Sequence, residues 1–477
     1  MLLNDLAPFL PDLGLLALAL VVLLADLAGE DSALPFHLAW IGLAAIAALL
    51  VPAAQYADAN IAEFAGYRVV SGGSGWKLLF TLAALGTVLL ARQYLRPGGN
   101  ARGTLGRSGA FLGLLIMCVQ GMFALVSATD LLVFYLGLEL ATLPIFALAA
   151  FQPRDPASAE AGAKYVLMGG FSSALTLFGI SFLYGVSGSL DFNALYHAAE
   201  VAPREPLLWG GLVFLGGGLG FKLVMAPLHM WAPDVYQGAP TPVTAFLSIG
   251  SKAAAVAAAA ALFLGPLDSL RLGLAGFFSA AAVLSMIAGN LGAMRQTDLR
   301  RFIAYSSIAQ VGYMLVALVG DSDAARFGLI YNVLVYGVTS FALFFIMGII
   351  GKEGPETIPA LRGLGRRHPG LGVLLVLAMF SLAGIPPLAG FLGKFLLFNA
   401  AAQDGHYVLV GIAVANAVVS FYYYMLLVKE AYMAEAAPAP ALALGGVRTL
   451  ALWGLALALL VLGMCPAALS WFGGFPR

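Results

Sequence analysis

The sequence carries very little charge. Only 10% of its residues are Asp, Glu, Lys or Arg, whereas a soluble domain uses about 25% because its whole surface faces water. Basic and acidic side chains number 24 each, so the chain lacks the excess of positive charge that attracts nucleic acid. The composition therefore excludes a soluble domain and a nucleic-acid-binding protein.

Cysteine is almost absent as well. Its two occurrences, Cys118 and Cys465, lie in apolar runs, which excludes a disulfide scaffold, a four-cysteine iron-sulfur cluster and a cysteine-rich zinc site. The histidines are scattered, and none belongs to an H-E-x-x-H pattern. The glycine-rich run 216–222 lies in an apolar segment and lacks the spacing of a dinucleotide site. We therefore expect the chain itself to bind no metal, nucleotide or redox cofactor.

Long apolar segments make up most of what is present. Hydrophobic residues account for 61% of the chain, and the mean hydropathy is +0.94. A helix needs roughly 20 apolar residues to cross the hydrocarbon core of a bilayer. We therefore predict an all-α membrane protein with about fourteen transmembrane helices, which cover residues 9–27, 34–53, 76–95, 109–128, 131–151, 163–187, 207–226, 241–264, 271–294, 300–319, 327–350, 371–388, 407–428 and 448–468.

The distribution of arginine and lysine between the loops predicts the orientation of these helices, because cytoplasmic loops retain an excess of both residues. The loops after odd-numbered helices hold fourteen of them, and the opposite side holds six: Arg68, Lys77, Arg204, Arg271, Arg326 and Arg477. We therefore expect a multi-pass protein with both termini on the side of the membrane away from the cytoplasm.

Prolines interrupt two of the predicted helices. Helix 7 contains Pro227 and Pro233, and helix 12 ends in Pro386 and Pro387. Proline removes a backbone donor, so each helix should break and leave carbonyls free inside the membrane. The breaks are five helices apart, which suggests two inverted five-helix repeats, helices 4–8 and 9–13, of the kind that transporters use. The chain would then divide into residues 1–107, 108–265, 266–434 and 435–477.

Five charged residues stand out within the apolar segments. They are Glu139 in helix 5, Lys164 in helix 6, Lys222 in helix 7, Lys252 in helix 8 and Lys394 in helix 12. A charge at the bilayer centre costs about 2.5–3.5 kcal/mol, so these side chains must find partners or water inside the bundle. Structural ion pairs or side chains reaching to the interface remain an alternative, above all for Lys164 and Lys252.

A buried lysine is suited to proton transfer. Burial disfavours its ammonium form and a nearby carboxylate favours it, so a moving partner can switch the lysine between holding and releasing a proton. Glu139 is the natural partner, and we pair it with Lys222. His229 and Asp234 follow the break in helix 7 and could either relay protons or cap the half-helix.

Several long motifs of this chain resemble one known family. They are GLELATLPIFALAAF with Glu139, AGAKYVLMGGFSSAL with Lys164, GFKLVMAPLHMWAPDVYQGAPTPVTAFLS with Lys222, SKAA with Lys252, RRFIAYSSIAQVGY, and FSLAGIPPLAGFLGKF with Lys394. The family comprises the antiporter-like membrane subunits of complex I, the proton-pumping NADH:quinone oxidoreductase, and related subunits of multisubunit Na+/H+ antiporters. The resemblance covers roughly helices 4–13.

The resemblance implies a role in coupling rather than in redox chemistry. FMN, iron-sulfur clusters and quinone would be handled by other subunits, and the partners would be other membrane-arm subunits, including the M-type one. Within the family, a lysine at the position of Lys394 resembles the N-type subunit, because the M-type subunit typically carries a glutamate at that position. One departure is Gln310, where many relatives carry His, which weakens a titrating role for helix 10.

The resemblance also implies a path for protons. Changes in the distance between Glu139 and Lys222 would drive a proton through Lys252 and water, and Lys394 would expel it. Two other functions stay open from the sequence. The chain could belong to a Na+/H+ antiporter that works without redox input, or it could be a structural scaffold for neighbouring subunits.

Overall fold

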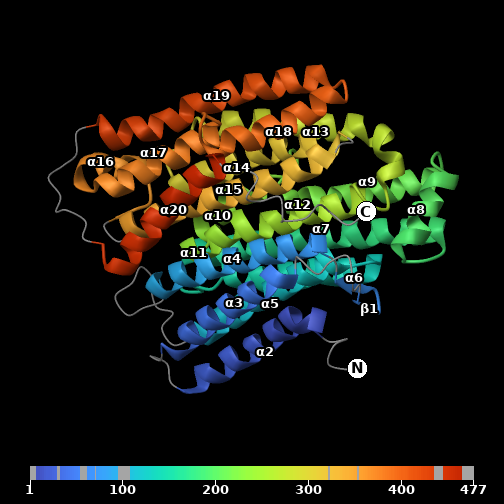
Figure 1. The fold of residues 1–477 in the computed structure, drawn as a ribbon, viewed down its shortest axis with the longest axis horizontal. Coiled ribbons are helices and arrows are strands. Elements are labelled where there is room, and N and C mark those ends of the chain that lie inside the picture. Colours follow the sequence, from blue (N-terminus) through green and yellow to red (C-terminus); the bar gives the residue numbers. More distant parts are fainter. Residues whose placement is uncertain are drawn as a thin grey trace. The chain divides into compact units, whose positions relative to one another are not determined.

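The computed structural model describes residues 7–28, 33–53, 62–69, 71–94, 108–320, 323–351, 354–434 and 444–464. The chain forms two compact units, one within Met1–Gly276 and the other within Phe277–Ser470. Nearly all described residues are helical, and Figure 1 shows the helices in chain order by colour.

The first unit holds the helices up to the start of α13. They are α2 (Leu10–Ala25), α3 (Leu34–Ala53), α4 (Ser71–Tyr94), α5 (Ser108–Ser127), α6 (Leu131–Ala149), α7 (Pro156–Ser187), α8 (Phe192–Val201), α9 (Pro206–Leu223), α10 (Trp231–Gly238), α11 (Thr241–Phe246) and α12 (Lys252–Phe263), with short 3-10 helices η1 (Ala7–Phe9), η2 (Asp26–Ala28) and η4 (Asp268–Leu270). A single turn of π-helix, η3 (Leu247–Ser251), joins α11 to α12. Within this unit α2, α3, α4 and α5 pack side by side (Figure 1).

The second unit begins within α13 (Arg271–Ala293). Its other elements are α14 (Leu299–Leu315), η5 (Val316–Leu318), α15 (Asp323–Ile350), η6 (Ile358–Leu361), α16 (Leu364–Arg367), α17 (Pro369–Ala383), α18 (Ala389–Gln403), α19 (Tyr407–Tyr432) and α20 (Gly446–Met464). Helix α17 packs against α15, α18, α19 and α20, and forms the centre of this unit.

The predicted spans are confirmed by the described helices. Twelve of these are long and apolar enough to cross a membrane, and two shorter apolar helices, Leu10–Ala25 and Pro369–Ala383, match predicted helices 1 and 12. The chain is therefore a multi-pass, all-α membrane protein. The expected location of the two termini falls on residues 1–6 and 465–477, which lie outside the described residues. The division into four segments stays a prediction.

Glycine allows the helices of each unit to approach closely. A Cβ built on Gly137 of α6 would lie 2.6 Å from the backbone nitrogen of Leu125 in α5, so only glycine fits this crossing. Gly179 of α7 is confined in the same way by the backbone of Leu215 in α9. Small residues at crossings bring helix backbones together where apolar burial gives no advantage over lipid.

Both predicted breaks are present, and they share a backbone design. Helix α9 ends at Leu223, and Val224 takes a left-handed conformation with φ of 62°. Helix α17 ends at Ala383, and Gly384 is left-handed with φ of 85°. Three residues further on, each break contains a proline after a cis peptide bond, Pro227 or Pro387. The chain then resumes helix, as α10 in the first unit and as α18 in the second.

A second shared feature supports the two repeats. Helix α6 begins after Asp130, whose carboxylate accepts a hydrogen bond from the Val133 amide, and α14 begins after Asp298, which accepts from the Arg301 amide in the same way. Such side-chain caps satisfy amides that a helix start leaves free. Each aspartate also forms a β-bridge to a later loop, Asp130 to Asp191 and Asp298 to Thr357. The predicted helices 5 and 10 therefore occupy equivalent places.

Several details differ from the sequence prediction. Predicted helix 12 stopped at residue 388, whereas α18 continues the chain as a helix to Gln403 and carries Lys394. A small hairpin of β1 (Ala62–Phe64) and β2 (Tyr67–Val69) precedes α4 and was not predicted. Lys77 was counted with the loop residues although predicted helix 3 begins at residue 76; that count was wrong, because Lys77 lies within α4 and its side chain is only 3% exposed. Its position near the helix start made the two alternatives hard to separate by hydropathy.

Candidate functional site

The first candidate site is an ion pair between α9 and α6. The Lys222 Nζ lies 3.7 Å from Oε1 of Glu139, and the two side chains are 6% and 14% exposed. This is the pair expected from the sequence. Charge-assisted hydrogen bonds are usually about 2.7–2.9 Å long, so the two charges attract one another across a gap that a small movement can close or widen.

Two hydroxyl groups complete this ion pair. The Lys222 Nζ donates to Oγ1 of Thr142 at 2.8 Å, and Ser173 Oγ donates to Glu139 Oε1 at 2.6 Å. Thr142 in turn donates to the Leu138 carbonyl of its own helix. The sequence analysis overlooked Thr142, although it lies three residues after Glu139 and therefore on the same helix face. Each hydroxyl thus holds one member of the ion pair in place, and neither fixes the distance between the lysine and the carboxylate.

Lys252 is buried on a neighbouring helix. It is 2% exposed and opens α12, directly after the π-helical turn η3. Helix α12 packs against α9, which carries Lys222. π-Helical turns are rare and occur often at functional sites, because they displace side chains from the regular helical register. Lys252 therefore lies on a helix that packs against the helix of Lys222, and a transfer of protons between the two lysines stays a prediction.

Lys164 does not belong to the buried group. Its side chain is 43% exposed and forms two ion pairs of 2.7 Å, with Glu160 of its own helix and with Asp234 of α10. Of the two alternatives that the sequence left open for Lys164, the structure favours the ion pair over a buried charge, because α7 turns this side chain outward. The structure thus joins Asp234 to Lys164. His229, between α9 and α10, has a buried Nδ1 without a hydrogen-bond partner among the described residues.

Lys394 in the second unit has a different environment. It is 5% exposed, and its Nζ donates to the carbonyls of Leu382 at 2.8 Å and Ala383 at 3.3 Å. These carbonyls are freed by the break after α17, and the negative end of the helix dipole lies there. The ring of Tyr313 lies 4.5 Å from the ammonium and adds a cation–π contact. No carboxylate of the described residues contacts Lys394.

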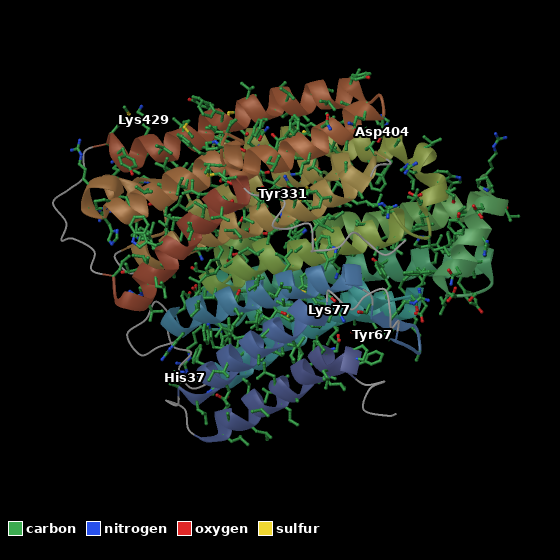
Figure 2. All side chains as sticks on the ribbon, in the orientation of Figure 1. His37, Tyr67, Lys77, Tyr331, Asp404 and Lys429 are labelled. Carbon is green, nitrogen blue, oxygen red and sulfur yellow. The ribbon has the colours of Figure 1, made fainter. Side chains whose placement is uncertain are left out.

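A further buried ion pair lies in the first unit and was missed. Lys77 Nζ donates to both carboxylate oxygens of Asp12 in α2, at 3.0 and 3.1 Å, and Tyr67 of the hairpin donates to the same carboxylate. Figure 2 labels Tyr67 and Lys77. Burial and the Asp12 carboxylate raise the pKa of the Tyr67 hydroxyl well above its ordinary value, so it stays neutral. Asp12 is thus a second acidic residue that is buried within a predicted membrane helix.

These groups have in common that they are titratable side chains held by ion pairs and hydrogen bonds. The lysines and Glu139 can each gain or lose a proton, and the broken helices supply polar backbone next to Lys222 and Lys394. Among the described residues, no three His, Cys, Asp or Glu side chains come together as a metal ion would require.

Comparison with known proteins agrees with this geometry. A family described as "NADH:quinone oxidoreductase/Mrp antiporter, TM" matches residues 128–420. The chain is 39% identical to NADH-quinone oxidoreductase subunit N of Moorella thermoacetica, over 88% of this chain and 86% of that protein. It is 37% identical to the subunit N of Desulfovibrio desulfuricans, over 100% and 95% of the two chains.

A solved structure shows the same fold. A chain of respiratory complex I from Thermus thermophilus superposes with a TM-score of 0.81 and 32% sequence identity, over 96% of this chain and 98% of that chain. Identity at this level over nearly the whole length indicates common ancestry as well as a common fold. The chain therefore belongs to the family of NADH-quinone oxidoreductase N subunits, the antiporter-like membrane subunits of complex I.

Proposed function

We propose that this chain translocates protons as a membrane subunit of a bacterial NADH:quinone oxidoreductase. Its partners are the other subunits of the membrane arm, including the M-type subunit, and the lipid bilayer. FMN, iron-sulfur clusters and quinone are held by other subunits, so the chain takes part in an enzyme without carrying a redox centre. Its membrane is the bacterial inner membrane, with both termini in the periplasm.

Protons pass through the buried lysines in this proposal. Movement of Glu139 relative to Lys222 changes the attraction across the 3.7 Å gap and so changes the tendency of Lys222 to hold its proton. A proton that leaves Lys222 passes to Lys252 on the neighbouring helix, and Lys394 releases it. His229 and the Lys164–Asp234 pair take part in proton transfer near the break after α9.

The ion pair between Glu139 and Lys222 is the observation that carries this proposal. Breaking a buried ion pair by removing one partner costs about 3–5 kcal/mol, so a structural role alone would favour a short, fully hydrogen-bonded pair. Here the direct hydrogen bond of Lys222 goes to Thr142, and the carboxylate remains 3.7 Å away. The relatives identified above are N subunits of NADH-quinone oxidoreductases, which favours this function over a separate Na+/H+ antiporter.

Replacement of Lys222 tests the proposal. In Lys222→Ala, we expect the complex to assemble while NADH-to-quinone turnover and proton uptake fall together, by about tenfold or more, because a positioned proton carrier is lost. Both are measured in inside-out membrane vesicles, with assembly checked by native electrophoresis.

The matched control is Lys429→Ala, which removes an exposed lysine near the end of α19 (Figure 2). It should leave turnover and proton uptake unchanged. Normal pumping in assembled Lys222→Ala vesicles would disprove the proposed path. Loss of assembly with normal activity per remaining complex would favour the scaffold function.

A further inference from the structure

Gln310 shares a hydrogen-bond acceptor with Lys394. Its Nε2 donates to the Leu382 carbonyl at 3.2 Å, the same oxygen that accepts from the Lys394 ammonium at 2.8 Å. A carbonyl oxygen can only accept, so the amide nitrogen of Gln310 must face it. Both side chains are at least 95% buried, since Gln310 is 3% and Lys394 5% exposed. The two donors therefore meet on one carbonyl at the second helix break.

Gln310 is itself held in place by a second bond. Its Nε2 also donates to the hydroxyl of Tyr424 at 3.2 Å, and this hydroxyl lies 2.6 Å from Oγ of Ser306. Tyr424 is fully buried on α19, and Ser306 is 3% exposed on α14. The amide thus bridges two helices, and its position does not depend on the charge of Lys394.

The same place in the first unit also contacts the lysine. Gln310 lies twelve residues after the capping Asp298, and Thr142 lies twelve residues after the capping Asp130. Thr142 accepts the direct hydrogen bond of Lys222. A polar side chain at this helix position therefore accompanies the buried lysine in both units, although it acts by accepting in one and by sharing an acceptor in the other.

We propose that Gln310 is a positioning residue for Lys394, because it keeps the Leu382 carbonyl hydrogen-bonded when the lysine gives up its proton. The break after α17 leaves this carbonyl without a partner in its own helix. Neutral lysine keeps two N–H groups but is a weaker donor than the ammonium, so proton release weakens the bond to this buried carbonyl, and that loss opposes release. With Gln310 already bound, the carbonyl keeps a donor whose strength does not depend on the charge of Lys394. Gln310 thereby allows Lys394 to alternate between its two protonation states without disturbing the helix end.

This inference rests on the proposed function, and the experiment separates the two. Gln310→Met retains the size of the side chain and removes both hydrogen bonds. We expect the complex to assemble, and coupled turnover and proton uptake to fall about three- to tenfold, because proton release from Lys394 becomes slow. Slow proton release should also raise the solvent deuterium isotope effect on turnover, which a purely structural defect would not change. The KM for quinone should stay the same.

Two further variants give the controls. Gln310→His retains an N–H donor toward Leu382 and should recover at least half of the turnover. Gln296→Met makes the same chemical change in the loop between α13 and α14, where the amide bonds the nearby Gly292 carbonyl, and should have no effect.

Lys394→Met distinguishes the possible failures. If it abolishes pumping while Gln310→Met pumps normally with an unchanged isotope effect, the positioning role of Gln310 is wrong and the proposed function stands. If Lys394→Met itself pumps normally, the lysine path fails and the inference fails with it. If Gln310→Met does not assemble, Tyr424→Phe, which releases the amide from α19 only, should show a smaller rise of the isotope effect; an unchanged value overturns the inference.

Discussion

The two units contain similar helix breaks but place their lysines on opposite sides of them. Counting from the left-handed residue, Lys222 lies two positions before Val224, and Lys394 lies ten positions after Gly384. The position equivalent to Lys222 in the second unit is Leu382, which contributes only its carbonyl. The repeats therefore share a backbone and differ in where they carry charge.

The other charged residues near the breaks also occupy positions that carry a different residue type in the other unit. Asp234 stands ten positions after Val224 and is thus the counterpart of Lys394. Asp234 pairs with Lys164, thirty-four residues after the capping Asp130, whereas the residue thirty-four after Asp298 is Asn332. Asn332 is buried, and it packs so tightly against α18 that a Cβ on Gly393 would lie 2.8 Å from its amide nitrogen.

This difference separates two ways of controlling a buried ammonium. Lys222 faces a carboxylate on another helix, so a change in distance between two charges can alter its protonation. Lys394 faces the carbonyl end of a half-helix and an aromatic ring, which are dipoles that stay fixed in place. The first unit is suited to respond to movement, and the second to bind and release a proton at a constant site.

Removing the carboxylate should have the largest effect and would sharpen this contrast. In Glu139→Gln we expect proton pumping to fall about tenfold or more, because Lys222 loses the charge that controls it. Proton uptake and NADH-to-quinone turnover in vesicles measure this. Glu200→Gln, the same change at an exposed glutamate of α8, serves as the control. Undiminished pumping in Glu139→Gln would remove the distinction between the two units.

Substitution of the left-handed residue at the second break should have an intermediate effect on pumping. In Gly384→Ala, the left-handed conformation costs about 1–2 kcal/mol, and the added Cβ would lie 3.2 Å from Cδ of Lys394. We expect a severalfold loss of pumping. In Val224→Gly, relief of the backbone strain is offset by the loss of a side chain that is only 2% exposed, so stability should change by no more than about 1–2 kcal/mol, with pumping retained. Thermal unfolding and proton uptake of both variants test the pair; equal pumping in both would show that the second break does not hold its lysine.

The smallest effect on pumping is expected at Lys77, a buried lysine that lies at no helix break. Asp12→Leu leaves Lys77 buried without its partner and should destabilise the protein by about 3–5 kcal/mol. The double variant Asp12→Leu with Lys77→Met replaces both charges by apolar groups and should recover most of this stability. Thermal unfolding measures stability, and proton uptake per assembled complex should stay normal. If the double variant were stable but pumped poorly, a buried lysine would contribute to pumping even where it lies at no helix break. The position of Lys222 and Lys394 at the breaks would then not be what makes them functional.

Hydropathy predicted the membrane helices because each needs a long apolar run, and proline predicted both breaks because it cannot continue the backbone ladder. The partnership of Glu139 and Lys222 followed from the cost of burying either charge alone. The sequence could not decide between a buried and an exposed Lys164, since its exposure depends on the rotation of α7 in the bundle. The Asp12–Lys77 pair was missed because both residues lie near helix starts, where hydropathy tolerates charge. Nothing in the segment 247–251 signals a π-helical turn.

That turn has a consequence for the direction of Lys252. A π-helical turn contains one more residue than an α-helical turn, and each residue advances a helix by about 100° around its axis. The face that Lys252 presents is therefore set by one surplus residue in η3. If η3 tightened into a regular α-helix, everything beyond it would rotate by about 100° relative to α11. Such a change in η3 would therefore turn Lys252 about the helix axis without a hinge and without unfolding any helical turn.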